Sequence, residues 1–133
     1  MNKWNSKNRH KYLLQYHIIF VCKYRRKLLS KNISDDIKRL PYEICNKHYI
    51  KIKEMETDKD YIHYMIEAEP TVSVSQIVNL MKSYTSYHIW RLHKNYLSKI
   101  FRKERTFWTD GYFACSIGNV SESTLRKYIQ NQG

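Results

Sequence analysis

The order of predicted elements indicates an α+β fold of the ferredoxin-like (RRM-like) class, an antiparallel four-stranded sheet with helices on one face and a further C-terminal helix that bears a tyrosine. Three observations predict it. Apolar and polar side chains alternate at 49–56 and again at 61–68, which is typical of the two strands of a hairpin. Strand-forming residues are concentrated at 12–21 and 112–117. Helical periodicity is found at 34–48 and 73–93. The 133 residues are expected to form a single domain.

The hairpin organises the chain. Within residues 61–68 a period of two separates two sets of side chains. The apolar set predicts a core face: Ile62, Tyr64, Ile66 and Ala68. The opposite set carries a phenol, an imidazole and a carboxylate: Tyr61, His63 and Glu67. Such a line of polar groups is unusual on a face that only packs.

The first half of the chain is otherwise a strand and a helix. The nearly continuous apolar run at 12–21 predicts a central strand. Ser34 and the acids that follow it suit a helix start, and apolar residues continue at helical spacing to about residue 48. Pro41 removes an N–H in the middle of this run, so we expect a kink, or a helix that effectively starts near Leu40.

The second half is expected to contain the longest helix and the last strand. Ser73 or Ser75 opens the helix, which continues to about residue 93. Residues 95–105 are interpreted as a basic connection, 107–111 as a turn and 112–117 as a strand. Asn119 is the expected cap of a terminal helix over 119–133.

The charge predicts a polyanionic partner. Lys and Arg number 24 and Asp and Glu 12, a net charge of +12 that favours nucleic acid. Residues 1–10 are interpreted as a flexible basic arm. Tyr87 and Trp90 are expected on an exposed helix face, where they either stack on bases or meet a second subunit. The candidate DNA-binding residues are Lys23, Arg25, Arg26, Lys27, Lys82, Tyr87, Trp90, Arg102 and Lys103.

The three cysteines are widely spaced, which indicates thiols of a reducing compartment rather than a disulfide framework. No apolar run is long enough for a membrane span, and the first residues lack the apolar stretch of a signal peptide. We therefore expect a cytoplasmic protein without a membrane partner.

Tyr128 is the candidate nucleophile. It lies off the expected packing stripe of the terminal helix, on one line with Gln132. A tyrosine can attack a phosphodiester and keep the cut end as a phosphotyrosine, and a divalent cation would neutralise the phosphate. His63 and Glu67 are candidate ligands for that cation. Spacing alone is a weak argument in a chain with twelve tyrosines.

Four stretches resemble the single-tyrosine HUH transposases of small insertion sequences, which move as single-stranded DNA. The stretches are YHIIF at 16–20 leading into KYRRK at 23–27, ETDKDYIH at 56–63, FWTDGYF at 107–113 and KYIQNQ at 127–132. They occur in the family's order and spacing, and the likeness covers nearly the whole chain.

The resemblance implies a homodimeric enzyme that recognises hairpins near the ends of its element. Such enzymes cleave one DNA strand, form a 5′-phosphotyrosine with a free 3′-hydroxyl, and rejoin the strands. It further implies Tyr128 as the nucleophile, His63 and Gln132 as ligands of Mg²⁺ or Mn²⁺, and Glu67 as possible support for the metal. The tyrosine helix of such enzymes can complete the site of the other subunit.

One position departs from the family motif, which is histidine, a hydrophobic residue and histidine. The first histidine position is Tyr61 here, and a phenol with a pKa of about 10 is a poor ligand near neutral pH. Three accounts stay open: Tyr61 ligates or holds a water, Glu67 or Gln132 compensates, or the site is weakened or dead. The alternatives to a transposase are a catalytically inactive relative that grips hairpin DNA or RNA, and a nuclease that uses water.

Overall fold

The computed structural model describes residues 13–116 and 122–131, with side chains from 127 onward in the second range. The expected basic arm, Asn119 and Gln132 lie outside these residues. In chain order the elements are β1 (Leu14–Val21), η1 (Lys23–Arg25), α2 (Lys31–Lys47), β2 (Lys51–Thr57), β3 (Tyr61–Ala68), α3 (Val74–Leu92), α4 (Lys94–Ile100), β4 (Phe113–Ser116) and α5 (Glu122–Asn131).

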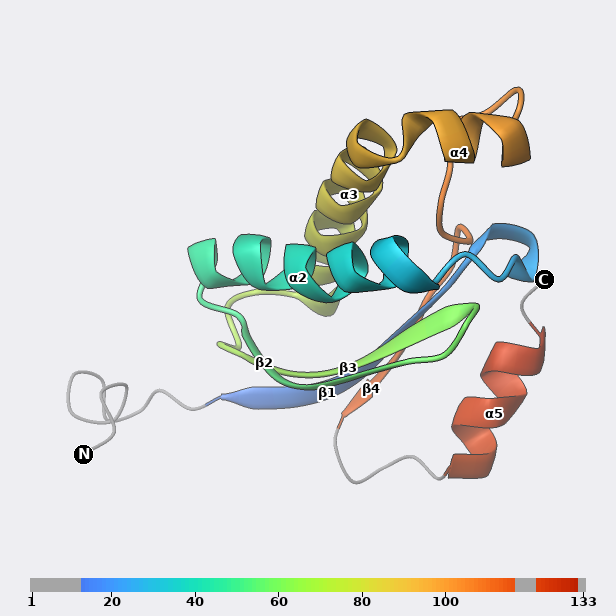
Figure 1. Cartoon of the computed structure of the whole chain (residues 1–133). Coiled ribbons are helices and arrows are strands. Elements are labelled where there is room, and N and C mark those ends of the chain that lie inside the picture. Colours follow the sequence, from blue (N-terminus) through green and yellow to red (C-terminus); the bar gives the residue numbers. More distant parts are fainter. Residues whose placement is uncertain (1–12, 117–121, 132–133) are drawn as a thin grey trace.

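The four strands form one antiparallel sheet in the order β2-β3-β1-β4. Helices α2 and α3 cover one face, and α5 lies on the opposite side (Figure 1). This is the predicted ferredoxin-like arrangement with an added terminal helix. We call the face under α2 and α3 the helical face.

The core fills the helical face. Ile18 and Phe20 of β1 and Ile62, Tyr64 and Ile66 of β3 are fully buried there. The helices contribute a second layer of buried apolar side chains: Ile33, Ile37, Leu40 and Ile44 from α2, and Ile77, Val78, Met81 and Ile89 from α3. These two layers bury the hydrophobic groups on which the fold depends.

Helix α2 corrects the expectation of a start at Ser34 or near Leu40. It runs without interruption from Lys31 to Lys47, with Ser30 as its N-cap and Pro41 inside. Proline in a helix interior costs about 3 kcal/mol. Burial of Ile37, Leu40 and Ile44 on either side of Pro41 offsets that cost, because a break would expose part of this stripe.

Helix α3 begins where the sequence predicts. Ser73 accepts a hydrogen bond from the backbone N–H of Gln76, and the Gln76 side chain accepts one from the Ser73 N–H, which forms a capping box. Near its end, however, Trp90 is only 4% exposed, so the expectation that it lies on an exposed face is wrong. Its indole donates to the carbonyl of Thr106 at 2.9 Å.

The segment after α3 explains this correction. Helix α4 occupies residues 94–100, most of which were expected in the connection at 95–105, and Leu97 is fully buried. The chain then returns with Phe101, Phe107 and Trp108, all at most 4% exposed. This returning segment covers Trp90, which an isolated helix would have left in solvent.

Across residues 13–116 and 122–131, the helices are too short or too polar to span a bilayer.

Candidate functional site

The face of the sheet opposite the core carries the polar side chains of β3. Burial along β3 alternates: Ile62, Tyr64, Ile66 and Ala68 are buried, while Tyr61, His63, Met65 and Glu67 are partly exposed. The predicted division of this strand into a core face and a polar face is therefore confirmed. We call the second face the histidine face.

Strand register arranges the histidine face in rows. One row crosses all four strands, with Glu56 of β2, His63 of β3, Ile19 of β1 and Phe113 of β4 as successive partners. In the next row His17 of β1 lies between Met65 and Cys115. Directly paired residues point to the same side of a sheet, so His17 and His63 share this face on neighbouring strands.

The two imidazoles meet. The Nδ1 of His17 lies 2.9 Å from the Nε2 of His63, a hydrogen-bonding separation, and the ring centroids are 5.0 Å apart. His17 is a site residue that the sequence prediction missed. The available signal was the alternation in the first strand, which places His17 opposite the apolar Ile18 and Phe20.

The surroundings of His63 favour its neutral form. Burial lowers the pKa of this imidazole, and the nearby His17 lowers it further. The carboxylates of Glu56 and Glu54 oppose this shift without reversing it. A neutral imidazole offers the lone pair that a metal ion binds.

Tyr128 lies on the same face as the histidines. Its ring packs 5.2 Å from that of Phe113, which shares a row with His63 and is separated from it only by Ile19 of β1. The hydroxyl of Tyr128 is buried and has no hydrogen-bond partner among the described residues. Burial raises the pKa of this phenol to about 12. The structure thus holds Tyr128 as a neutral phenol.

The other two metal candidates on β3 lie differently. Tyr61 is partly exposed, in register with Val21 and two residues before His63. Glu67 is four residues beyond His63, roughly 13 Å along the strand. It accepts a hydrogen bond from Gln15 at 2.5 Å and lies 3.8 Å from the Lys53 ammonium.

The structure therefore does not bring Glu67 to His63. In the described part of the chain, no group of three or more His, Cys, Asp or Glu side chains could surround a metal ion. Among the described side chains, the imidazoles of His17 and His63 are the candidate ligands that lie in contact, while Gln132 lies outside the described residues.

Two of the four basic side chains at residues 23–27, which are predicted to bind DNA, already form ion pairs within the protein. Lys23 is paired with Asp110 at 3.4 Å and Arg25 with Asp60 at 3.1 Å, whereas Arg26 and Lys27 are exposed. Tyr24 and Arg25 have φ angles of 58° and 51°, in the left-handed region. This region is energetically unfavourable for residues other than glycine, and residues that adopt it are often found in functional segments.

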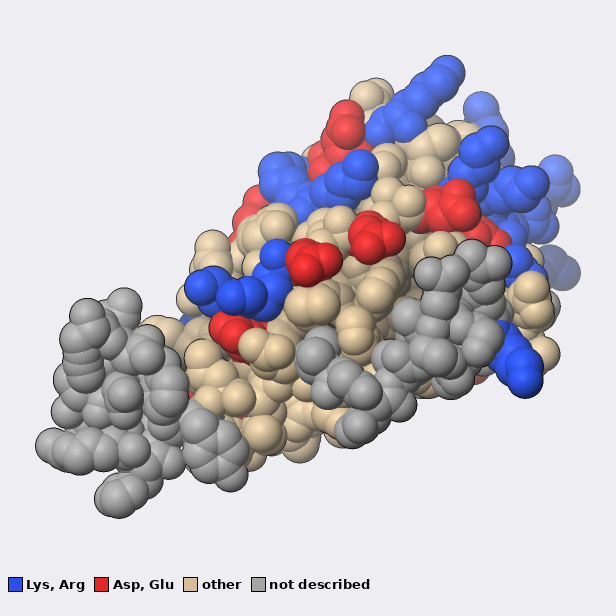
Figure 2. Space-filling view, turned by 90° about the horizontal axis from the view of Figure 1, so that it is seen from below, with Lys and Arg blue, Asp and Glu red and all other residues tan. Residues whose placement is uncertain are grey.

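A tyrosine joins this cluster to a second basic segment. The Tyr24 hydroxyl donates to the Glu104 carboxylate at 3.1 Å, beside the exposed Arg102 and Lys103. Figure 2 shows Lys and Arg side chains gathered at one end of the molecule, the end where Figure 1 places α4. The structure thus brings together two of the basic segments that the sequence predicts to bind DNA.

Lys82 has a different place. Its ammonium donates to the carbonyls of Thr109, Asp110 and Gly111 at 2.6, 3.2 and 3.1 Å. Burial lowers its pKa. An ammonium has three N–H donors, so these carbonyls use all of them. Its predicted contact with DNA would require these bonds to be exchanged.

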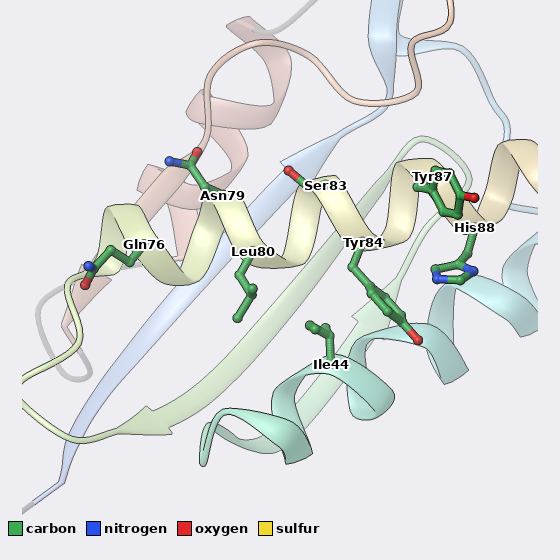
Figure 3. Close-up of a pocket in the computed structure, with 8 residues that line it drawn as sticks. All are labelled: Ile44, Gln76, Asn79, Leu80, Ser83, Tyr84, Tyr87 and His88. Carbon is green, nitrogen blue, oxygen red and sulfur yellow. The ribbon is translucent and has the colours of Figure 1, made fainter.

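Tyr87 is 64% exposed, as predicted, at the rim of a hollow between α2 and α3. The hollow has a volume of about 570 Å³, and Figure 3 shows Tyr84, Tyr87 and His88 along one part of its lining. Ile44 of α2 faces them from the other helix. This hollow is on the helical side of the sheet, so it does not include the histidine pair.

The family follows from comparison with known proteins. Residues 10–132 match the family described as "Transposase IS200 like". The match places the chain among the transposases, which are DNA-processing enzymes. More narrowly, the chain belongs to the IS200-like transposase family.

Curated relatives agree with this assignment. The transposase for insertion sequence element IS200 from Salmonella typhimurium is 27% identical over 98% of this chain and 78% of its own length. The ISDra2 transposase TnpA from Deinococcus radiodurans is 22% identical over 91% of this chain and 85% of its own.

Solved structures support the fold. The crystal structure of a putative transposase from Deinococcus radiodurans superposes with a TM-score of 0.83 at 22% identity, over 91% of this chain and 92% of that one. A REP-associated tyrosine transposase bound to a REP hairpin gives a TM-score of 0.58 at 10% identity, over 87% of this chain and 62% of that one.

Proposed function

We propose that this transposase cleaves and rejoins single-stranded DNA at hairpin-bearing ends of its element, with Tyr128 as the nucleophile. The observation that carries the proposal is the Tyr128 hydroxyl, which is buried on the same sheet face as His63 and has no hydrogen-bond partner among the described residues. A buried hydroxyl without a hydrogen-bond partner destabilises the folded protein. Such destabilising features are common at active sites, where the group is needed for the reaction.

The reaction exchanges one phosphoester for another. The Tyr128 oxygen forms a bond to phosphorus and the bond from phosphorus to the 3′-oxygen breaks. The products are a 5′-phosphotyrosine and a 3′-hydroxyl, which takes up a proton as the tyrosine loses one. Attack by a 3′-hydroxyl on the phosphotyrosine reverses the exchange and joins strands without an external energy source.

The proton of Tyr128 must leave before or during attack. Since burial raises its pKa to about 12, almost no phenolate exists near neutral pH. His63, held neutral on the same face, is a group that can accept a proton or bind a cation. A Mg²⁺ or Mn²⁺ ion held by His63 and Gln132 would supply positive charge at the phosphate.

The basic end formed by residues 23–27 and 102–103 would hold the DNA backbone. The REP-associated relative is bound to a hairpin, which supports a hairpin as the ligand here. We further propose a homodimer, in which the terminal helix of one subunit can serve its own site or that of its partner.

The test uses a single-stranded oligonucleotide that carries the end of the element, with and without Mg²⁺ or Mn²⁺. A protein–DNA adduct that resists denaturant, needs the metal and disappears in Tyr128→Phe is the expected result. Tyr42→Phe, which alters an exposed tyrosine of α2, is the matched control and should form the adduct.

Tyr61 favours one second function, the binding of hairpins without cleavage. Under that function the wild-type protein shifts a hairpin in a binding assay but forms no adduct with either metal. Recovery of the adduct in Tyr61→His would then mean that the nucleophile is intact and the first motif position limits the reaction.

A further inference from the structure

The structure places a second imidazole beside His63, in a chain whose motif has lost one of its two histidines. The family motif places two histidines on one strand, and Tyr61 replaces the first of them here. His17 reaches His63 from the neighbouring strand β1 instead. These two residues are 46 positions apart in sequence, and the sheet register brings them together.

The separation of the two ring nitrogens suits a shared cation. The Nδ1 of His17 and the Nε2 of His63 are 2.9 Å apart. Two ligands about 2.1 Å from an octahedral ion and at right angles to each other are about 3.0 Å apart. Ligands of a tetrahedral zinc ion would be about 3.3 Å apart, which needs only a small movement of the rings.

The charges nearby also favour a cation. Glu56 is the direct partner of His63 on β2, and Glu54 is one row away on the same face. Neither carboxylate touches the pair closely enough to make a third ligand, since the described residues hold no such group of three. Their negative charge still lowers the energy of a positive ion between the imidazoles.

We propose that His17 replaces the missing motif histidine, so that the imidazoles of His17 and His63 together form the divalent-metal site of this chain. The use of that ion in DNA cleavage rests on the proposed function, but its binding does not. Water or a DNA phosphate would take the remaining positions of an ion that two imidazoles hold.

The pair also moves the expected position of the ion. Motif position 61 lies on one side of His63 along β3, whereas His17 lies in the row of Met65, on the other side of His63. Successive rows on one face are about 7 Å apart. An ion between His17 and His63 is therefore displaced toward Met65, and Tyr61 has no part in holding it.

Binding of Mn²⁺ to the full chain without DNA tests this inference, with free Mn²⁺ measured by electron paramagnetic resonance. We expect His17→Ala and His63→Ala each to weaken binding at least tenfold. Two controls should bind as the wild type does: Tyr61→Phe, which removes the phenol, and His88→Ala, which removes an imidazole on the helical side. Wild-type affinity in His17→Ala, or a loss in Tyr61→Phe, would overturn the proposal.

A measurement on the unaltered protein guards against variants that misfold. Zn²⁺, a diamagnetic ion that imidazole nitrogens bind, should shift the imidazole ¹⁵N NMR signals of His17 and His63 and leave those of His88 and His93 in place. A shift of the His63 signals without a shift of the His17 signals would refute the shared site. If the pair binds Mn²⁺ but no adduct forms with DNA, the proposed cleavage fails and the metal site stands. If His17→Ala binds Mn²⁺ and forms the adduct like the wild type, the proposed metal site is refuted and the proposed cleavage is not.

Discussion

The two faces of the sheet differ in what their side chains do, although they share the same strands. On β3, the residues that face α2 and α3 are at most 1% exposed and apolar apart from one hydroxyl. The residues on the histidine face are half-buried, and His63 and Glu67 are held by polar contacts. Stability thus depends mainly on one face and the candidate chemistry on the other, so each can be altered separately.

Two tyrosines, one on each face, show the difference between the faces most directly. Among the described side chains, buried polar atoms without a partner occur only at the hydroxyls of Tyr64 and Tyr128. Tyr64 lies in the core of the helical face, and Tyr128 lies against Phe113 on the histidine face. The same chemical group should therefore be dispensable on one face and essential on the other.

The largest expected effect is that of Tyr128→Phe on strand cleavage. The rate should fall by at least about 10⁴-fold, because the variant has no oxygen to form the phosphotyrosine. Tyr64→Phe should cleave at the wild-type rate, and its free energy of unfolding should be unchanged or higher, since it removes a buried unpaired hydroxyl. Single-turnover cleavage and urea unfolding measure the two quantities. Slow strand cleavage by Tyr64→Phe would contradict this difference between the two faces.

Adjacent residues of β3 provide the next test. Ile66 is fully buried on the helical face, so Ile66→Ala should lower the free energy of unfolding by about 2–5 kcal/mol. Met65 is half-buried on the histidine face, and Met65→Ala should cost at most about 1.5 kcal/mol. Urea unfolding of both variants gives these values. Equal losses would mean that both faces contribute a comparable core.

A buried hydroxyl of the helical face gives a smaller effect. Thr85 is fully buried, donates to the carbonyl of Met81 at 2.7 Å and accepts from the indole N–H of Trp108 at 3.0 Å. Thr85→Val leaves the indole N–H unpaired and should cost about 1–3 kcal/mol in urea unfolding. Thr85→Ser retains the hydroxyl and is the matched control. A stable Thr85→Val variant would show that the indole finds another partner.

On the histidine face, protonation of His63 should make the free energy of unfolding depend on pH. Its pKa in the folded protein lies below the ordinary value of 6.5, so the unfolded chain binds more protons in the interval between the two. The stability that this group contributes is present above pH 6.5 and is lost as the pH falls through the folded pKa. NMR titration of the imidazole should show a midpoint below that of an exposed histidine. A midpoint above 6.5 would contradict this.

At the other end of the pH range, the smallest effect concerns the docking of Tyr128. Its folded pKa of about 12 exceeds the ordinary value of 10, so its stabilising contribution is complete below pH 10 and is lost as the pH rises toward 12. The difference in absorbance at 295 nm between the wild type and Tyr128→Phe should titrate near 12. A difference curve centred at 10 would indicate a solvated phenol.

Local patterns were sufficient to predict several elements. The strict alternation of residues 61–68 fixed both the bounds and the faces of β3, because a strand with one buried side requires that pattern. The capping side chain of Ser73 similarly marked the start of α3. These features depend on neighbours only a few residues away.

The errors at Trp90, helix α2 and His17 share one cause, which is dependence on segments distant in sequence. Trp90 is buried because residues 101–108 return over it, and α2 passes through Pro41 because its apolar stripe is already packed. The contact between His17 and His63 needs the register of β1 against β3. A pattern within one segment contains none of this information.

The ion pairs of residues 23–27 have a consequence for experiments at different ionic strengths. A phosphate that takes Lys23 or Arg25 must first displace Asp110 or Asp60, and the released carboxylate then gathers a cation from solution. That uptake cancels part of the cation release that normally drives DNA binding. Arg26 and Lys27 are exposed and form no ion pair with the residues that the structure describes, so they contribute in full. The logarithm of affinity should therefore fall with the logarithm of salt concentration less steeply than the four charges in KYRRK would suggest.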